Sequence, residues 1–217
     1  MAALVMMTVL VSLPAPPEGP RYTVPRTDFV SSAWELDFEF EDLRRIQFQH
    51  PGDSAPTTYW YMIYKVTNRT GKDVEFFPSF RLVTDTLDTV IAGDHVSPLI
   101  YEQIAQRHSG LFPFFVPPIR IMGKLLQGDA NSRSSAAVFR TFDPNASSFR
   151  ILVSGLSGAI ERVNNPGFDA SKPKSEDENP QFFVLRRTLV IAYNLPGDAR
   201  TRALARPIRK SREWVMQ

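Results

Sequence analysis

One stretch near the start of the chain alternates strictly between apolar and acidic side chains. Trp34, Leu36, Phe38 and Phe40 are apolar, and a carboxylate follows each of them. Successive side chains of a β-strand point to opposite faces, so this spacing collects the apolar side chains on one face, whereas a helix would spread them around its axis. The sequence therefore predicts a strand over 34–41 with a buried apolar face. Its acidic face, which we expect to be solvated, comprises Glu35, Asp37, Glu39 and Glu41.

A second segment is apolar at nearly every position, which predicts a strand that is buried on both faces. Residues 59–66 contain four aromatic side chains and a single charged one. Such a strand lies in the middle of a sheet or against a second layer. Asn68 and Gly71 supply turn chemistry directly after it. We therefore expect residues 74–77 to return beside it as an antiparallel partner.

Turn residues separate several further short apolar segments. These expected strands cover residues 80–83, 89–92, 119–126, 136–142, 149–153, 159–163 and 182–193. Short strands separated by turn residues are typical of a sandwich or barrel, rather than of a fold in which strands and helices alternate. One helix interrupts them, since Ser97 and Pro98 supply an N-cap and a first helical residue and Gly110 follows the last turn. The predicted fold class is mainly all-β: an antiparallel sandwich with one short inserted helix and irregular termini.

The two ends of the chain differ in composition from the middle. Residues 1–33 comprise an apolar run over 2–13 and a linker that contains five prolines. A run of this length is typical of a secretory signal and is too short to span a bilayer, and the alternative is a buried N-terminal strand or helix. We expect one β-sandwich domain over 34–196, in which 164–181 is a polar loop of low order. A basic tail over 197–217 follows it.

Residues 64–76 read Tyr-Lys-Val-Thr-Asn-Arg-Thr-Gly-Lys-Asp-Val-Glu-Phe. They resemble bacterial immunoglobulin-like modules found outside the cytoplasm, in which an early core strand runs into a Thr-Asn-x-Thr/Ser-Gly-Lys/Asp turn and back into an apolar strand. A looser pattern, which adds residues 34–40 and 123–128, is similar to an uncharacterised family of exported planctomycete proteins. The first resemblance implies an immunoglobulin-like two-sheet fold and an extracytoplasmic location. The second implies no catalytic residue.

Catalytic and metal-binding patterns are scarce. The chain has no cysteine, which excludes disulfides, thiolate metal sites and a cysteine nucleophile. Residues 154–158 lack the Gly-x-Ser-x-Gly spacing of a nucleophile elbow and are better explained as a turn. His50, His95 and His108 are too far apart in sequence for one strand or helix to present two imidazoles, so a site that combines His50, His95 and Asp94 would need the fold to bring them together. The sequence therefore identifies no catalytic, cofactor-binding or metal-binding residue.

The most apolar loop, over 111–118, places three phenylalanines among prolines. If Phe112, Phe114 and Phe115 are exposed, they form a patch for a protein partner or a lipid surface. The alternative is that they pack over one end of the sandwich.

Two arginine pairs provide a second candidate surface. Arg44 precedes Arg45 in one expected strand region, and Arg186 precedes Arg187 in another. If the first and last strands are neighbours, one arginine of each pair shares a face and a small cationic strip results. The alternative is that these arginines form ion pairs with the acidic face of 34–41.

The C-terminal segment carries most of the positive charge. Residues 198–217 contain six Lys and Arg but only two Asp and Glu, a net charge of +4, and because the whole chain carries +2 the other residues carry −2. Arg209, Lys210 and Arg212 would suit an anionic surface, and the alternative is a solvated tail. A body near neutrality lacks the broad positive field that attracts nucleic acid.

These patterns leave three classes of function. The first, which we favour, is a non-enzymatic, exported interaction or structural module of the cell envelope, periplasmic or secreted, that meets a protein partner or an envelope surface. The second is a hydrolase or a metal- or ligand-binding protein whose site is assembled from loops. The third is a cytoplasmic protein whose basic tail binds nucleic acid or anionic lipid. No cofactor and no transmembrane helix are predicted.

Overall fold

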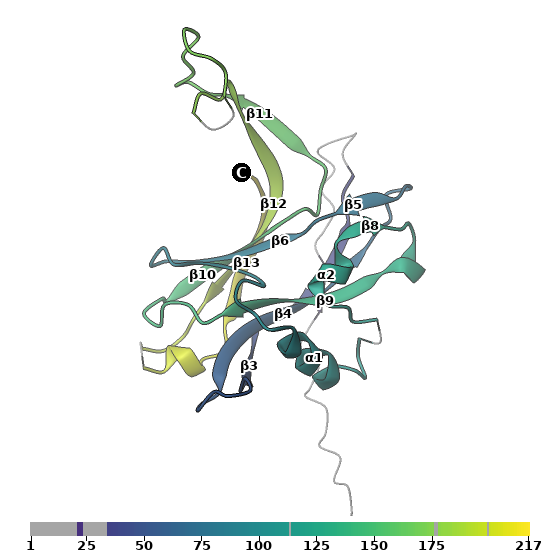
Figure 1. The fold of residues 1–217 in the computed structure, drawn as a ribbon, viewed down its shortest axis with the longest axis vertical. Helices are drawn as coiled ribbons and strands as arrows, with labels where there is room; N and C mark the ends of the chain where they lie inside the picture. The colour runs from purple at the N-terminus through teal and green to yellow at the C-terminus, as the bar shows by residue number, and fades with distance from the viewer. Residues whose placement is uncertain (1–20, 24–33, 113, 176–177, 199) are drawn as a thin grey trace, which may run out of the picture.

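The computed structural model describes residues 21–23, 34–112, 114–175, 178–198 and 200–217. Two antiparallel β-sheets enclose the main apolar core, and a pair of short strands lies beside them (Figure 1). The export-signal-like run and the proline-rich linker predicted within residues 1–33 lie outside the described residues, except for a three-residue strand over 21–23.

The first sheet has five strands, with β4 (Thr57–Thr67) at its centre. β9 (Arg133–Arg140) pairs along one edge of β4. β2 (Asp37–Glu41) and β3 (Arg44–Phe48) pair with successive parts of the other edge. β1 (Arg21–Thr23) extends the sheet beyond β2, so this sheet includes residues that precede the expected domain boundary at 34.

The second sheet has six strands, of which β12 is the longest. Its strands are β6 (Ser79–Thr84), β7 (Thr89–Ile91), β10 (Ser148–Ser154), β11 (Ile160–Asn164), β12 (Phe182–Asn194) and β13 (Ile208–Met216). β10 and β11 pair with successive parts of β12, and β13 pairs with β12 as well. β6 lies beside β10, and β7 lies at the edge beyond β6.

The remaining elements are short. They are β5 (Val74–Phe76), β8 (Gly123–Leu125), α1 (Pro98–Arg107), α2 (Pro118–Ile121) and the 3-10 turns η1 (Asp129–Asn131) and η2 (Arg202–Leu204). The helix predicted after Ser97 is confirmed as α1, and the Ser97 hydroxyl accepts a hydrogen bond from the Leu99 N–H at 3.4 Å.

Apolar side chains pack on both sides of the first sheet. Between the sheets, Phe38 is fully buried, and the ring of Tyr64 lies 4.7 Å from that of Phe80 in the second sheet. On the outer face, Tyr61 packs in a separate cluster with Ile104 of α1. β4 is therefore buried on both faces, as predicted. The mainly all-β, antiparallel fold with an inserted helix is confirmed.

The strand expected to return beside β4 pairs elsewhere. Residues 74–76 form β5, which pairs with β8. Both edges of β4 are already occupied by β2, β3 and β9, so no edge remains for β5. The predicted turn is nevertheless present: the Asn68 side-chain oxygen accepts from the Thr70 N–H at 3.1 Å, and Gly71 has a φ of +87°.

Residues 119–126, expected to form one strand, divide between two elements. Pro118 begins α2, because the fixed φ of proline suits the first position of a helix. Extended backbone then follows over the three residues of β8. α2 contributes the fully buried side chain of Ile121 to the main core.

The C-terminal segment is a strand of the sandwich, which corrects the prediction of an irregular basic tail over 197–217. β13 pairs with β12 from Arg187 to Asn194. Trp214 packs against the main core, and the Arg187 guanidinium lies 4.6 Å from the centre of its ring. Strand pairing and the packing of one indole therefore order this segment in spite of its charge, and the predicted boundary at 197 divides a single sheet.

Candidate interaction surfaces

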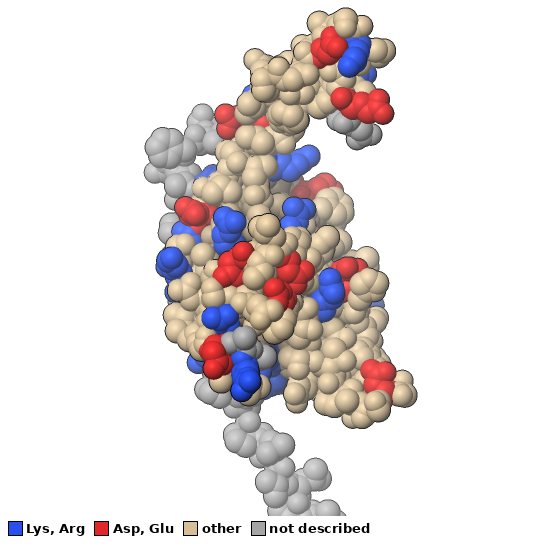
Figure 2. All heavy atoms as spheres, turned by 90° about the vertical axis from the view of Figure 1, so that its left-hand side faces the viewer, with Lys and Arg blue, Asp and Glu red and all other residues tan. Residues whose placement is uncertain are grey.

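A two-stranded arm projects from the second sheet (Figure 1). It consists of β11 and residues 182–186 of β12. All five residues of β11 are exposed, and Phe182, Phe183 and Val184 are 44–50% exposed. Because these three are consecutive, apolar side chains reach solvent on both faces of the arm. In Figure 2, acidic and basic side chains are interspersed over the sandwich, whereas uncharged surface predominates along the middle of the arm.

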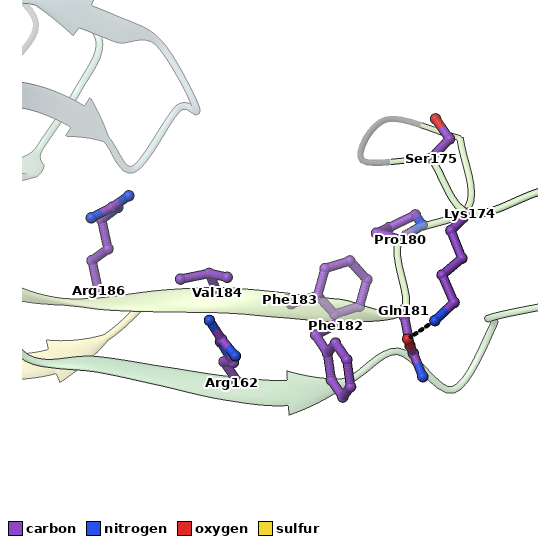
Figure 3. A pocket seen from close by; sticks show the side chains of 9 residues that line it. All are labelled: Arg162, Lys174, Ser175, Pro180, Gln181, Phe182, Phe183, Val184 and Arg186. Atoms are coloured by element: carbon purple, nitrogen blue, oxygen red, sulfur yellow. Dashed lines mark hydrogen bonds between the residues drawn. The ribbon is translucent and has the colours of Figure 1, made fainter.

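A hollow of about 840 Å³ lies along the arm (Figure 3). The register places Arg162 opposite Val184, and opposed residues share a face of the ribbon. Arg162, Val184 and Arg186 extend to the same side in Figure 3. Three cations and no carboxylate occur among the described residues that line the hollow. These residues are Arg162, Lys174, Ser175, Pro180, Gln181, Phe182, Phe183, Val184 and Arg186.

Residues 165–175 and 178–181 lie at the tip of the arm, where an asparagine organises the backbone. Asn179 is buried; its side-chain NH₂ donates to the Asp169 carbonyl at 2.9 Å, and its side-chain oxygen accepts from the Asp169 N–H at 3.0 Å. Lys174 Nζ donates to Gln181 Oε1 at 2.7 Å, which positions this cation beside the hollow (Figure 3). The low order predicted for this loop stays a prediction.

The phenylalanine-rich loop is not one exposed patch. Phe112 is 7% exposed and packs with Ile104 against the outer face of the first sheet. Phe115 is half-buried against the same cluster, whereas Phe114 is 73% exposed. The packing alternative therefore holds for Phe112 and Phe115, on the face of a sheet rather than over an end of the sandwich.

The two arginine pairs do not form a common strip, because β3 and β12 belong to different sheets. Arg187 Nη1 lies 2.7 Å from Glu35 Oε2, and Arg44 Nη2 lies 2.9 Å from Glu41 Oε2. Arg45 donates to the Leu204 carbonyl at 2.9 Å. Ion pairing, the alternative interpretation, is therefore confirmed for one member of each pair, and Arg186 belongs to the cationic hollow.

The acidic face of 34–41 is paired with cations, which corrects the expectation of free solvation. Glu41 is 2% exposed, and it lies close to Phe112, whose loop covers this part of the sheet. A carboxylate removed from water needs a compensating partner. The four pairs are Glu35–Arg187, Asp37–Arg69, Glu39–Lys65 and Glu41–Arg44.

The cations predicted at the C-terminus lie on β13. The Arg209 guanidinium lies 5.8 Å from the centre of the Phe40 ring, so it stacks against an aromatic side chain of the first sheet. Lys210 and Arg212 are exposed on the same strand. The three side chains are therefore carried by the sandwich and not by a separate tail.

The three histidines have separate surroundings. His50 Nε2 and the Tyr59 hydroxyl lie 2.9 Å apart, and His108 Nε2 lies 3.0 Å from the Tyr61 hydroxyl. His95 is exposed beside Asp94. Within the described part of the chain, no group of three or more His, Cys, Asp and Glu side chains could hold a metal ion.

We expect the protein to become less stable to unfolding in mild acid because of the buried side chain of His108. Burial, and then the nearby charges of Arg44 and Arg107, lower the pKa of His108 to about 4. An unfolded histidine has a pKa of about 6.5, so below that pH the unfolded state binds a proton that the folded state excludes until about pH 4. The free energy of unfolding should therefore fall by about 1–2 kcal/mol between pH 7 and pH 5 through this group.

Urea unfolding at both pH values tests this dependence. His108→Gln should flatten it, and His95→Gln, at an exposed histidine, should retain the wild-type slope. An unchanged slope in His108→Gln would assign the acid sensitivity to other groups.

Comparison with known proteins finds no family model, no curated protein and no solved structure that matches the chain. None of the described helices is long and apolar enough to cross a membrane.

Proposed function

We propose that the chain is a non-enzymatic interaction module of the cell envelope that binds a protein partner through the arm. The exposure of apolar side chains on both faces of the arm, beside a cationic hollow, carries this proposal. A two-stranded ribbon with both faces in water is marginally stable alone. A partner that covers Phe182, Phe183 and Val184 removes their apolar surface from water and stabilises the arm in the same step.

The chemistry of the hollow favours an acidic polypeptide segment as the partner. Arg162, Lys174 and Arg186 line the hollow, and the described lining contains no carboxylate to neutralise them. Opposite charge on a partner accelerates the encounter and selects against basic competitors. Phe182 and Val184 supply the apolar contacts that anchor such a segment.

The proposed location in the envelope rests on the sequence. The apolar run over 2–13 is typical of an export signal, and residues 64–76 resemble extracytoplasmic immunoglobulin-like modules. The intact mass of the protein from fractionated cells tests this part of the proposal. Recovery in an envelope fraction without the apolar run would support export, and a full-length protein in the cytoplasmic fraction would contradict it.

Binding of a glutamate–tyrosine random copolymer tests the arm. We expect saturable binding by fluorescence anisotropy that weakens as salt is added, because the cations of the hollow are exposed to screening. The triple variant Arg162→Glu/Lys174→Glu/Arg186→Glu should lose at least tenfold in affinity. Its stability should be close to wild type, since all three side chains are exposed and the variant loses only the exposed hydrogen bond from Lys174 to Gln181.

A matched charge change elsewhere provides the control. Arg200→Glu/Arg206→Glu/Lys210→Glu alters three exposed cations of the C-terminal segment by the same amount. This variant should bind the copolymer as the wild type does. If it loses binding and the arm variant does not, the basic C-terminal segment is the anion-binding surface and the arm proposal is wrong.

A further inference from the structure

We propose that a second pocket, lined by residues of β3, β4, η2 and the segment after β9, binds a small organic carboxylate with an apolar, ring-sized body. The pocket has a volume of about 370 Å³, within the range of small-molecule sites. β3 and β4 of the first sheet contribute one wall, and η2 together with Leu195, which follows β12, contributes another. The proposed site shares no lining residue with the hollow of the arm.

Two aromatic side chains, Trp60 and Phe142, line the pocket, and packing holds both in place. The rings of Trp60 and Phe142 are stacked with their centroids 5.7 Å apart. Trp60 and Leu195 are almost completely buried in the main core, and Phe142 also packs against Phe149. These side chains have little freedom to move, so the apolar surface is present before any molecule binds. A flat apolar body that enters the pocket therefore incurs little cost for reordering the protein.

Two guanidinium groups are held at the pocket by backbone carbonyls. Arg45 lies 5.6 Å from the centre of the Trp60 ring and donates to the Leu204 carbonyl. Arg202 donates through Nε to the Gly197 carbonyl at 2.8 Å and through Nη1 to the Asn145 carbonyl at 2.7 Å. These carbonyls orient the two guanidinium groups, and Arg202 also interacts electrostatically with Asp198, which lies outside the lining. Arg202 Nη2 has no hydrogen-bond partner among the described residues, so its donors remain for a carboxylate.

Asp143, the single carboxylate among the described residues that line the pocket, accepts hydrogen bonds from a residue two positions along the chain. Asp143 accepts hydrogen bonds from the Asn145 N–H at 2.9 Å and from the Asn145 side chain at 3.1 Å. A hydrogen bond from Thr86, followed by those from Asn145, lowers the pKa of Asp143. These neutral donors hold Asp143 in its ionised form, so the described lining combines two cations with one carboxylate and carries a net charge of +1. An anionic head group on an apolar body matches this arrangement, and an ammonium group does not.

The hydrogen bonds of Arg45 and Arg202 also connect separate elements around the pocket. Arg45 on β3 bonds to Leu204 of η2, and Arg202 of η2 bonds to Asn145 in the loop that follows β9. A carboxylate that bridges Arg45 and Arg202 would therefore add a further connection between elements of both sheets. Binding should raise the melting temperature as well as produce a direct binding signal.

Calorimetric titration of the full chain with 3-phenylpropanoate tests the site. We expect saturable binding, a higher melting temperature, and at least tenfold weaker binding of the uncharged isostere 3-phenylpropanamide. Arg202→Gln should weaken binding of the carboxylate at least tenfold, whereas Arg206→Gln, at an exposed arginine outside the pocket, should leave it unchanged. Arg45→Gln on the opposite wall provides a second test if Arg202→Gln disturbs the loop.

Three results would overturn the proposal: no saturable binding of 3-phenylpropanoate, equal affinity for the amide, or full affinity in both Arg45→Gln and Arg202→Gln. The triple variant of the arm should bind 3-phenylpropanoate as the wild type does. The proposal for the arm and the proposal for this pocket are therefore tested independently.

Discussion

Replacement of Phe38 by alanine should lower the free energy of unfolding by about 3–5 kcal/mol. Phe38 is fully buried between the sheets, where its ring centroid lies 5.6 Å from that of Tyr64 and 6.3 Å from that of Phe80. Alanine removes these contacts and leaves a cavity that neither sheet can collapse to fill. Urea unfolding monitored by circular dichroism gives the difference.

The neighbouring residue supplies the control for Phe38. Glu39 points to the other face of β2 and pairs with Lys65 at 3.2 Å in a partly exposed position. Glu39→Ala should therefore change the free energy of unfolding by no more than about 0.5 kcal/mol. Similar effects of the two substitutions would contradict the division of this strand into a core face and an outer face.

Replacement of Asn68 by alanine should cost about 2–4 kcal/mol, although a turn residue is usually tolerant. Asn68 is fully buried, and its side-chain NH₂ donates to the Lys72 and Leu125 carbonyls, each at 2.8 Å. Its side-chain oxygen accepts from the Thr70 hydroxyl at 2.8 Å. Alanine removes this donor from the carbonyl of the buried Leu125, and it removes the side-chain connection between the turn after β4 and β8.

Two further variants sharpen the Asn68 prediction. Asn68→Asp keeps an acceptor for Thr70 but loses the donors and buries a charge, so it should be at least as unstable as Asn68→Ala. Asn164→Ala, at an exposed asparagine of the arm, should remain within about 0.5 kcal/mol of wild type in the same chemical-denaturation assay. A wild-type free energy of unfolding in Asn68→Ala would show that water replaces the side chain.

Local patterns explain the parts of the fold that the sequence predicts well. Alternation over 34–41 corresponds to β2, and the continuous apolar run over 59–66 corresponds to β4. Ser97 and Pro98 locate the start of α1, because the cap is made by residues adjacent in the chain. In each case the deciding interactions lie within one segment or depend on burial alone.

Pairing partners depend on edges that no local pattern reveals. β5 pairs with β8 because β4 has no vacant edge, and β13 joins the sheet although it contains Arg209, Lys210 and Arg212. The burial of Glu41 likewise depends on a loop more than sixty residues away, which brings Phe112 over the first sheet. These features require the assembled structure.

Local sequence patterns do not predict the candidate interaction surfaces. The sequence predicts strands over 159–163 and 182–193, but it does not indicate that the apolar side chains of the arm are exposed. The signal in β11 is the absence of a clean alternation, since Ile160 shares one face with Arg162 and Val163 shares the other with Glu161. The pocket beside η2 has no local signature, because its walls come from both sheets.

β12 runs without a break from the arm into the middle of the second sheet (Figure 1). Within the sheet it is hydrogen-bonded to β10 on one side and to β13 on the other. Tension applied along the arm therefore acts on both ladders in shear, so that many hydrogen bonds share the load rather than rupturing one by one.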